Sequence, residues 1–237
     1  MKRSIILAAL FLAVPQAFAA DDIDNIGGLA QDQFAGFSED LNALLAYRGV
    51  QPAEPLGIIG FDVGIEASYI DVESRDAWNI ASGDDVSAIP VARLAVNKGL
   101  PFGVDVGAFY SQVPGSNAKL VGAQLRYAIV EGGVVTPAVG LRAGYSRLEG
   151  VDELDGETRS LDLSISKGFG PVTPYIGYGK VWGEFTPDAS TGLSAEEPDE
   201  NRAYAGVRFS LLVLQFSFEA EKMGERAGYT AKLGFGF

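Results

Sequence analysis

The final segment of the chain alternates between two kinds of side chain. Reading back from Phe237, every second residue is apolar or aromatic, and these residues are Phe237, Phe235, Leu233, Ala231 and Tyr229. The residues between them are glycine, lysine and threonine, so the other face is small or polar. This period of two indicates a β-strand. A strand that meets lipid with its apolar face has to pair its backbone on both edges, and a closed barrel achieves this.

Ten segments of the chain alternate in this way, and each has roughly the 10 to 15 residues that a tilted strand needs to cross an outer membrane. They lie near residues 57–71, 86–98, 102–113, 118–130, 137–148, 158–168, 173–185, 202–212, 214–223 and 227–237. Ten is an even number, as bacterial barrels require. The predicted fold is therefore all-β, a closed antiparallel transmembrane β-barrel of about ten strands over residues 57–237, with a short N-terminal helix before it.

The ten alternating segments and the aromatic residue Phe237 at the end of the last one resemble Gram-negative outer-membrane β-barrel proteins as a class. The resemblance covers most of the chain, but it identifies no family of known activity. It implies that the protein resides in the outer membrane, in contact with outer-membrane lipid and lipopolysaccharide. It also implies that the barrel-assembly machinery engages the C-terminal strand, with Phe237 as its terminus.

Residues 1–19 have the features of a secretory signal peptide. Lys2 and Arg3 form a basic start, residues 5–14 are apolar, and Ala17 to Ala19 match a small-x-small cleavage site. No later segment has about 18 consecutive apolar residues, which excludes a helical inner-membrane protein. The chain contains no cysteine, so neither a lipid-anchored N-terminus nor a disulfide framework is expected.

Composition is consistent with a small barrel. Of 237 residues, 30 are glycine, which suits a crowded polar lumen where larger side chains would collide. Removal of the signal peptide takes away two positive charges and lowers the net charge from −13 to −15. This acidic balance argues against nucleic acid as a partner, because its phosphates require patches of lysine and arginine.

The alternation also predicts which side chains face lipid. Four tyrosines fall on the predicted lipid face near the external end, as expected of an aromatic girdle at the lipid headgroups, and they are Tyr69, Tyr110, Tyr145 and Tyr229. The seventh strand is ambiguous. Ile176, Tyr178, Lys180 and Trp182 form one of its faces, and Tyr175, Gly177, Gly179 and Val181 form the other.

The predicted inner faces carry charges whose sign mostly alternates between neighbouring strands. The candidates for a lumen charge network are Asp62, Glu66, Arg93, Asp105, Arg126, Arg142, Asp162, Arg208, Glu219, Glu221 and Lys232. Closure of the tenth strand on the first places Lys232 beside Asp62 and Glu66. One interpretation is a structural network, because an unpaired charge in a narrow lumen is costly. The other is a polar conduit or ligand site lined by fixed charges.

The connections between strands differ at the two ends of the predicted barrel. Short turns near residues 97–99, 131–133, 168–171 and 212–213 are predicted to face the periplasm. The opposite connections include the longest and most acidic ones, residues 73–85, 149–157 and 186–202, which are predicted to face outside.

Residues 20–56 do not alternate and contain a predicted amphipathic helix. Its apolar face consists of Phe34, Phe37, Leu41, Leu44 and Leu45, and its opposite face carries Glu39, Asp40 and Asn42. Asp32 is a candidate N-cap, and Gly49, Pro52 and Pro55 are expected to end the helix. The preferred interpretation is a plug that occludes the periplasmic mouth. The alternatives are contact with a partner and a loosely ordered leader.

Catalysis is not expected. The chain has no histidine, whereas outer-membrane barrel enzymes such as lipid A acyltransferases and deacylases, barrel phospholipases and omptin-like proteases resemble one another in using histidine. No cofactor is expected, and no metal site built on imidazole or thiolate can exist. The acidic stretch 152–157 lacks the ligand spacing of a calcium loop.

Two functions therefore remain open. The preferred one, because a polar-lined lumen and a movable plug suit transport, is a narrow small-solute channel or transport barrel with a charged lumen, partly occluded by the N-terminal helix. The second is a closed structural or surface-interaction barrel that acts through acidic extracellular loops.

Overall fold

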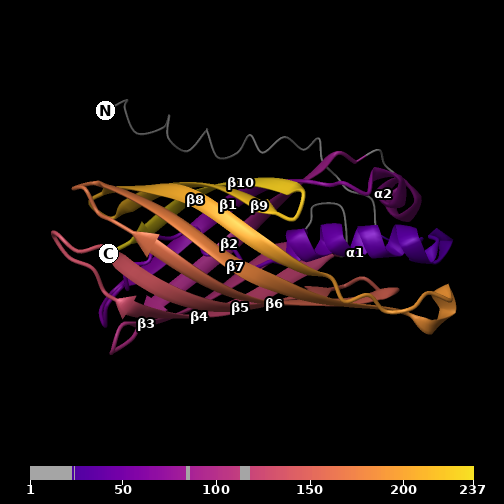
Figure 1. The fold of residues 1–237 in the computed structure, drawn as a ribbon, viewed down its shortest axis with the longest axis horizontal. Coiled ribbons are helices and arrows are strands. Elements are labelled where there is room, and N and C mark those ends of the chain that lie inside the picture. The colour runs from indigo at the N-terminus through magenta and orange to yellow at the C-terminus, as the bar shows by residue number, and fades with distance from the viewer. Residues whose placement is uncertain (1–22, 24, 84–85, 113–117) are drawn as a thin grey trace, which may run out of the picture.

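The computed structural model describes residues 23, 25–83, 86–112 and 118–237, so the predicted signal peptide lies outside the described residues. It is a closed antiparallel barrel in which consecutive strands pair and β1 pairs with β10 (Figure 1), which confirms the predicted fold class. The strands are β1 Phe61–Asp71, β2 Ala88–Gly99, β3 Val104–Gln112, β4 Lys119–Val130, β5 Ala138–Glu149, β6 Leu154–Ser166, β7 Val172–Pro187, β8 Asp199–Leu211, β9 Leu214–Met223 and β10 Arg226–Gly236.

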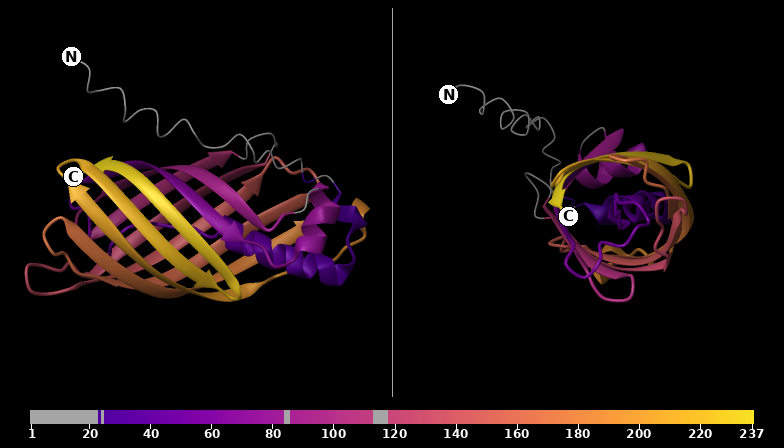
Figure 2. Two further views of the ribbon diagram at one scale, coloured as in Figure 1. Left: turned by 90° about the horizontal axis from the view of Figure 1, so that it is seen from above. Right: turned by 90° about the vertical axis from the view of Figure 1, so that its left-hand side faces the viewer.

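Two α-helices accompany the barrel. Helix α1, Gln31–Leu45, precedes β1 and lies within the ring of strands, as the view along the barrel in Figure 2 shows. Helix α2, Arg75–Ser82, lies between β1 and β2, where the sequence predicted only a long connection. Two 3-10 turns, η1 Ile26–Gly28 and η2 Ala189–Thr191, complete the elements of the described residues. No helix in the described part of the chain is long and apolar enough to cross a membrane.

The two ends of the barrel are built differently. The connections β2–β3, β4–β5, β6–β7 and β8–β9 are short and lie near the C-terminus, and we call this the short-turn end (Figure 1). The opposite end carries α2, η2 and the start of α1, and we call it the long-loop end. The prediction of a long connection over residues 149–157 is wrong, because β5 continues to Glu149 and β6 already begins at Leu154.

The outward face of the strands is apolar over a broad band. Leu94, Leu125 and Phe218 are among many large apolar side chains that are about half exposed. In β7, Ile176 and Tyr178 are exposed while Tyr175 is buried, which establishes the facing that the sequence left ambiguous. A soluble monomer rarely exposes so much contiguous apolar surface, whereas a transmembrane barrel presents it to lipid.

The interior has an apolar half and a polar half. Near the long-loop end, inward side chains such as Phe109, Leu120, Leu148, Val181 and Phe185 join the apolar residues of α1 and α2 in one buried core. Towards the short-turn end, the buried inward residues are mostly polar or charged, including Asp62, Asn97, Asp105, Gln124 and Arg126. The hydrophobic core of this protein therefore lies inside its barrel, around α1.

Candidate functional site: a plugged and charged lumen

Residues 30–56, which we call the plug, pass through the barrel along its length. The plug begins with α1 at the long-loop end and continues as an irregular segment towards the short-turn end (Figure 2). There, the backbone N–H of Ala53 donates to Ser166 Oγ at 3.0 Å, and that of Leu56 donates to Asp105 Oδ1 at 3.0 Å. The chain then turns at Gly57, where φ is +76°, and enters β1.

The predicted position of the helix at the short-turn mouth is wrong, because α1 occupies the other end of the lumen. The apolar residues Phe34, Phe37, Leu41, Leu44 and Leu45 are all buried, as their spacing suggests. The inner wall of the described barrel is apolar only near its long-loop end, and there these residues pack against it. Asp40 and Asn42, predicted to lie on a polar outer face, are buried too, because the barrel surrounds the C-terminal half of the helix.

The start of α1 also differs from the prediction. The N-cap residue is Ala30, whose backbone N–H donates to Gln33 Oε1 at 3.0 Å, while Asp32 lies exposed in the first turn. A carboxylate in the first turn still interacts favourably with the positive end of the helix dipole.

Asp40 fastens α1 to α2 from within the protein. Its fully buried carboxylate accepts hydrogen bonds from the backbone N–H groups of Glu73 and Ser74, at 3.1 and 3.0 Å, and from Trp78 Nε1 at 3.0 Å. Arg226 Nε donates to the same carboxylate at 2.5 Å. The Trp78 ring lies 4.6 Å from that of Phe37. One side chain thus joins the plug, the β1–β2 connection and β10.

Two further connections at the long-loop end hold the beginning of the described chain. Glu153, between β5 and β6, accepts a hydrogen bond from the backbone N–H of Ile26 at 3.0 Å. Gln31 bonds in both directions with Ser194, between β7 and β8, and also donates to Glu196 at 2.6 Å. The β1–β2, β5–β6 and β7–β8 connections are therefore tied to the N-terminal segment as well as to the barrel.

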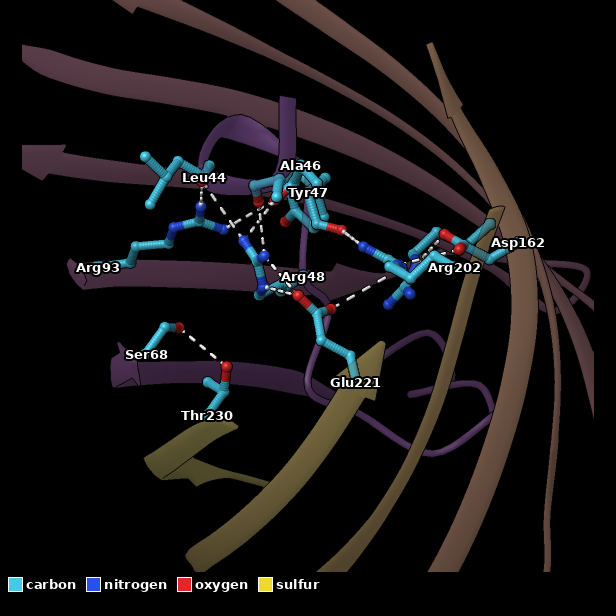
Figure 3. Close-up of polar contacts among 12 residues, drawn as sticks. Leu44, Ala46, Tyr47, Arg48, Ser68, Arg93, Asp162, Arg202, Glu221 and Thr230 are labelled. Carbon is cyan, nitrogen blue, oxygen red and sulfur yellow. Dashed lines mark hydrogen bonds and ion pairs between the residues drawn. The ribbon is translucent and has the colours of Figure 1, made fainter. Parts of the chain in front are cut away.

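Three arginines donate hydrogen bonds to backbone carbonyls at and just after the C-terminal end of α1, where helix carbonyls lack intrahelical partners. Arg93 donates to the carbonyls of Leu44 and Ala46 at 2.6 and 3.1 Å (Figure 3). Arg48 donates to the carbonyl of Ala43 at 2.6 Å, and Arg202 donates to that of Tyr47 at 2.7 Å. Positive charge also suits the negative end of the helix dipole. Four carbonyls at this end of the plug, those of Ala43, Leu44, Ala46 and Tyr47, therefore accept hydrogen bonds from arginine side chains.

Acidic side chains of the wall balance these arginines. Arg48 Nε donates to Glu221 Oε1 at 2.7 Å, and Arg202 Nη2 donates to Asp162 Oδ1 at 2.9 Å. Asp162 also accepts from Arg142 Nε at 3.1 Å. The guanidinium of Arg93 lies 4.4 Å from the centre of the Phe109 ring, a cation–π contact. Figure 3 shows this cluster between the plug and strands β2, β6, β8 and β9.

The part of the lumen between α1 and the short-turn end, which we call the lower lumen, contains a second set of ion pairs. Arg126 pairs with Asp105 and donates to the carbonyls of Pro52 and Glu54 at 2.8 and 3.1 Å. Lys232 Nζ lies 2.5 Å from Asp62 Oδ1 and 3.6 Å from Glu66 Oε1, the position expected from the closure of β10 on β1. All five side chains are buried.

The structure brings the predicted lumen charges together on the inner wall. Ten of the eleven are buried, and Arg208 is partly exposed. The predicted girdle residues Tyr69, Tyr110, Tyr145 and Tyr229 are all exposed on the outer face. Phe237 exchanges backbone hydrogen bonds with Phe61 at 3.1 Å, which extends the pairing of β10 with β1 to the end of the chain.

Three residues of this site, Arg48, Arg202 and Arg226, were not predicted from the sequence. Arg202 lies six residues before Arg208 and Arg226 six before Lys232, so period-two alternation puts each on the inner face. They were overlooked because they lie at the boundaries of predicted strands: Arg202 is the first residue of the segment 202–212, and Arg226 lies one residue before the segment 227–237. No sequence pattern pointed to Arg48, whose partner Glu221 is 173 residues away.

The plug fits closely against the wall. A Cβ atom at Gly144 would lie 2.7 Å from Tyr47 Cβ, so only glycine leaves room for that ring. A cavity of about 10 Å³ lies between Gln51, Ala53 and the wall, near Arg126 and Arg142. A space of this size holds about one water molecule at most. Among the described residues, no group of three or more carboxylates is placed to hold a metal ion.

No protein-family model and no curated protein matches the chain. Among solved structures, it is similar to the N-terminal β-barrel domain of OprF from Pseudomonas aeruginosa, with 17% identity and a TM-score of 0.36 over 74% of this chain and 97% of that one. The KdgM porin matches at 7% identity and a TM-score of 0.39, over 74% and 99%. OprG, an outer-membrane protein of P. aeruginosa, matches at 10% identity and 0.37, over 79% and 99%. The chain's own closed topology and apolar exterior make it a barrel of the outer-membrane class.

Proposed function

We propose that the protein is an outer-membrane β-barrel with a closed lumen, which acts as a structural or surface-interaction barrel through its long-loop end. The observation that carries this proposal is the apolar inner wall around α1. A solute pathway is lined by polar groups that keep it hydrated. Removal of α1 would instead expose Phe109, Leu120, Val181 and Phe185 to water.

The energetics of the plug support a closed resting state. Burial of a large apolar side chain stabilises by about 1.5–3 kcal/mol, and α1 buries five of them. Displacement of the helix therefore costs on the order of 10 kcal/mol before its polar contacts are counted. Open molecules would be very rare without a partner that binds the displaced state.

The long-loop end offers a surface through which a closed barrel could bind a partner. The plug and three connections form it together, so it is a fixed surface rather than a set of independent loops. It is acidic, with the described residues Glu73, Asp76, Asp152, Asp188 and Glu197 against Arg75. We expect this end to face outside and the short-turn end to face the periplasm. We also expect outer-membrane lipid and lipopolysaccharide to surround the apolar band and the assembly machinery to engage β10. The proposal includes no catalytic activity.

A gated small-solute channel is the second candidate, and the polar lower lumen favours it. Asp62, Glu66, Lys232 and Arg142 would keep the space below α1 hydrated if the plug moved. In this case the plug would be a gate, and a ligand or partner would have to displace it.

Single-channel recording distinguishes the two candidates. The mature protein, refolded and checked by heat-modifiable gel migration, is compared in planar bilayers with a variant that lacks residues 20–53. We expect no openings of any kind from the intact protein. Conductance from the deletion variant is expected under both candidates and shows that the plug closes the lumen. Steady conductance by the intact protein would reject the closed barrel. Brief openings that the deletion makes permanent would support the gated channel.

A further inference from the structure

The turns at the short-turn end carry large apolar side chains at their tips, where water-exposed turns usually carry polar ones. These residues, which we call the apolar tips, are Ile59, Phe102, Val134, Val135, Phe169 and Leu212, and they are 63 to 97% exposed. They come from the segment before β1 and from all four turns of this end. Ile59 and Phe102 were predicted to lie in strands, but β1 begins at Phe61 and β3 at Val104.

Two apolar tips occupy backbone positions that disfavour bulky side chains. Phe102 has a φ of +64° and Leu212 a φ of +58°, in the left-handed region where glycine or asparagine is usual. Both side chains are at least 90% exposed, so packing within the protein does not compensate for this conformation. Contact with something outside the barrel would account for their presence.

On one side of the barrel, the apolar band on the strands is shorter than the hydrophobic thickness of a membrane. In β5 the outward residues are apolar only from Val139 to Tyr145, and the next outward residue is Arg147. At about 2.5 Å of axial rise per residue in a tilted strand, this stretch covers about 15 Å of the ~25 Å that a membrane requires. In β6 the apolar stretch, Leu161–Ile165, covers only about 10 Å. The next apolar side chains along the axis are the tips Val134, Val135 and Phe169.

Nine backbone carbonyls at this end accept hydrogen bonds from within the protein, as a lipid environment favours. Lys167 Nζ donates to the carbonyls of Gly133, Val134 and Thr136 at 2.7 to 3.3 Å. Lys98 Nζ likewise donates hydrogen bonds to the carbonyls of Ile58, Gly60 and Gly99. The carbonyls of Gly103, Pro171 and Val213 accept from backbone N–H groups of adjacent strands.

We propose that the apolar tips lie in the acyl-chain region of the membrane leaflet at the short-turn end, where they complete the hydrophobic thickness of the barrel. The tips continue the established lipid-facing surface, and Lys98 and Lys167 take the place of water at the turn carbonyls. A lipid surface is therefore the occupant that the geometry fits. The barrel is seated with its short-turn end in the lipid and its long-loop end raised above it.

Single-cysteine labelling tests this placement, because the natural chain contains no cysteine that would interfere. The variants Val134→Cys, Phe102→Cys and Leu212→Cys carry an environment-sensitive fluorophore and are reconstituted as full mature chains in vesicles. Leu125→Cys serves as the lipid-facing control, and Ser190→Cys, exposed in the β7–β8 connection, serves as the aqueous control. Each label is exposed to lipids brominated in their acyl chains and, separately, to iodide on both sides of the bilayer.

We expect the tip labels to be quenched by brominated lipid to within about twofold of the Leu125 label and to resist iodide. Iodide quenching of the tips at the level of the Ser190 label would overturn the proposal and leave a protein as the occupant. Val134 has no positive φ, so its variant is informative even if the Phe102 or Leu212 variant folds poorly.

Discussion

Replacement of Asp40 by alanine should loosen the contact between α1 and α2 without unfolding the barrel. The substitution removes one buried acceptor that serves Glu73 N–H, Ser74 N–H, Trp78 Nε1 and Arg226 Nε. Each buried donor left without a partner costs about 1–3 kcal/mol. Arg226 keeps Glu39 and Glu200 as partners at 3.0 and 2.8 Å, so its charge is not stranded. Three neutral donors at this cost would give about 3–9 kcal/mol, and because the Glu73 and Ser74 N–H groups are only partly buried, the local opening free energy should fall by about 3–5 kcal/mol.

Hydrogen exchange measures this loss directly. Since every 1.4 kcal/mol is a factor of ten, the amides of α2 and the C-terminal half of α1 should exchange roughly one hundred to several thousand times faster. Strand amides should be unchanged. Asp32→Ala on the same helix is the matched control, because Asp32 is exposed and interacts only with the helix dipole, so a change of a few-fold is expected. Equal protection of α1 and α2 in wild type and Asp40→Ala would refute the role assigned to this carboxylate.

Two further pairs of substitutions test how the strands lie in the membrane and how the inner wall packs. Val106→Arg should lower folding stability in bilayers by about 2–4 kcal/mol. Gln112→Arg, on the same face of β3 but near the long-loop end, should lower it by only about 0–1 kcal/mol. Equal losses of stability in urea titrations would mean that the strand is placed wrongly in the membrane. Gly144→Leu should lower folding stability by about 1–3 kcal/mol, because its side chain would meet Tyr47 on the crowded inner wall. Ala143→Leu, at the outward neighbour, should change stability little, and equal losses from the two variants in urea titrations would contradict the packing seen at Gly144.

The sequence predicted the strands because alternation marks them wherever one face meets lipid. It failed where the strands leave the membrane, since outward residues such as Asp155 and Glu157 are then polar and the pattern disappears. For this reason the start of β6 was taken for a loop. Arg202 and Arg226 were missed because they lie at, or one residue outside, the predicted strand boundaries, although each continues the inward parity of its strand.

The position of the plug could not be predicted in the same way. The spacing of Phe34, Phe37 and Leu41 indicates a helix with one apolar face, but it does not say which surface that face meets. The answer lies in residues far away in the chain, such as Phe109, Leu120 and Phe185, which face inwards and are apolar only near the long-loop end. Local periodicity reports which side of a strand a residue occupies and carries no information on which end of the lumen a separate helix enters.

Disulfide trapping is the most direct test of the claim that the plug lies inside the barrel. A Cβ atom at Gly140, on the inner wall, would lie 3.5 Å from Ala53 Cβ, which suits a disulfide. The pair Ala53→Cys and Gly140→Cys should therefore cross-link in the folded barrel under mild oxidation. The pair Ala53→Cys and Leu141→Cys should not, because Leu141 faces outwards. Absence of the first cross-link, or equal formation of both, would contradict a plug that passes through the lumen.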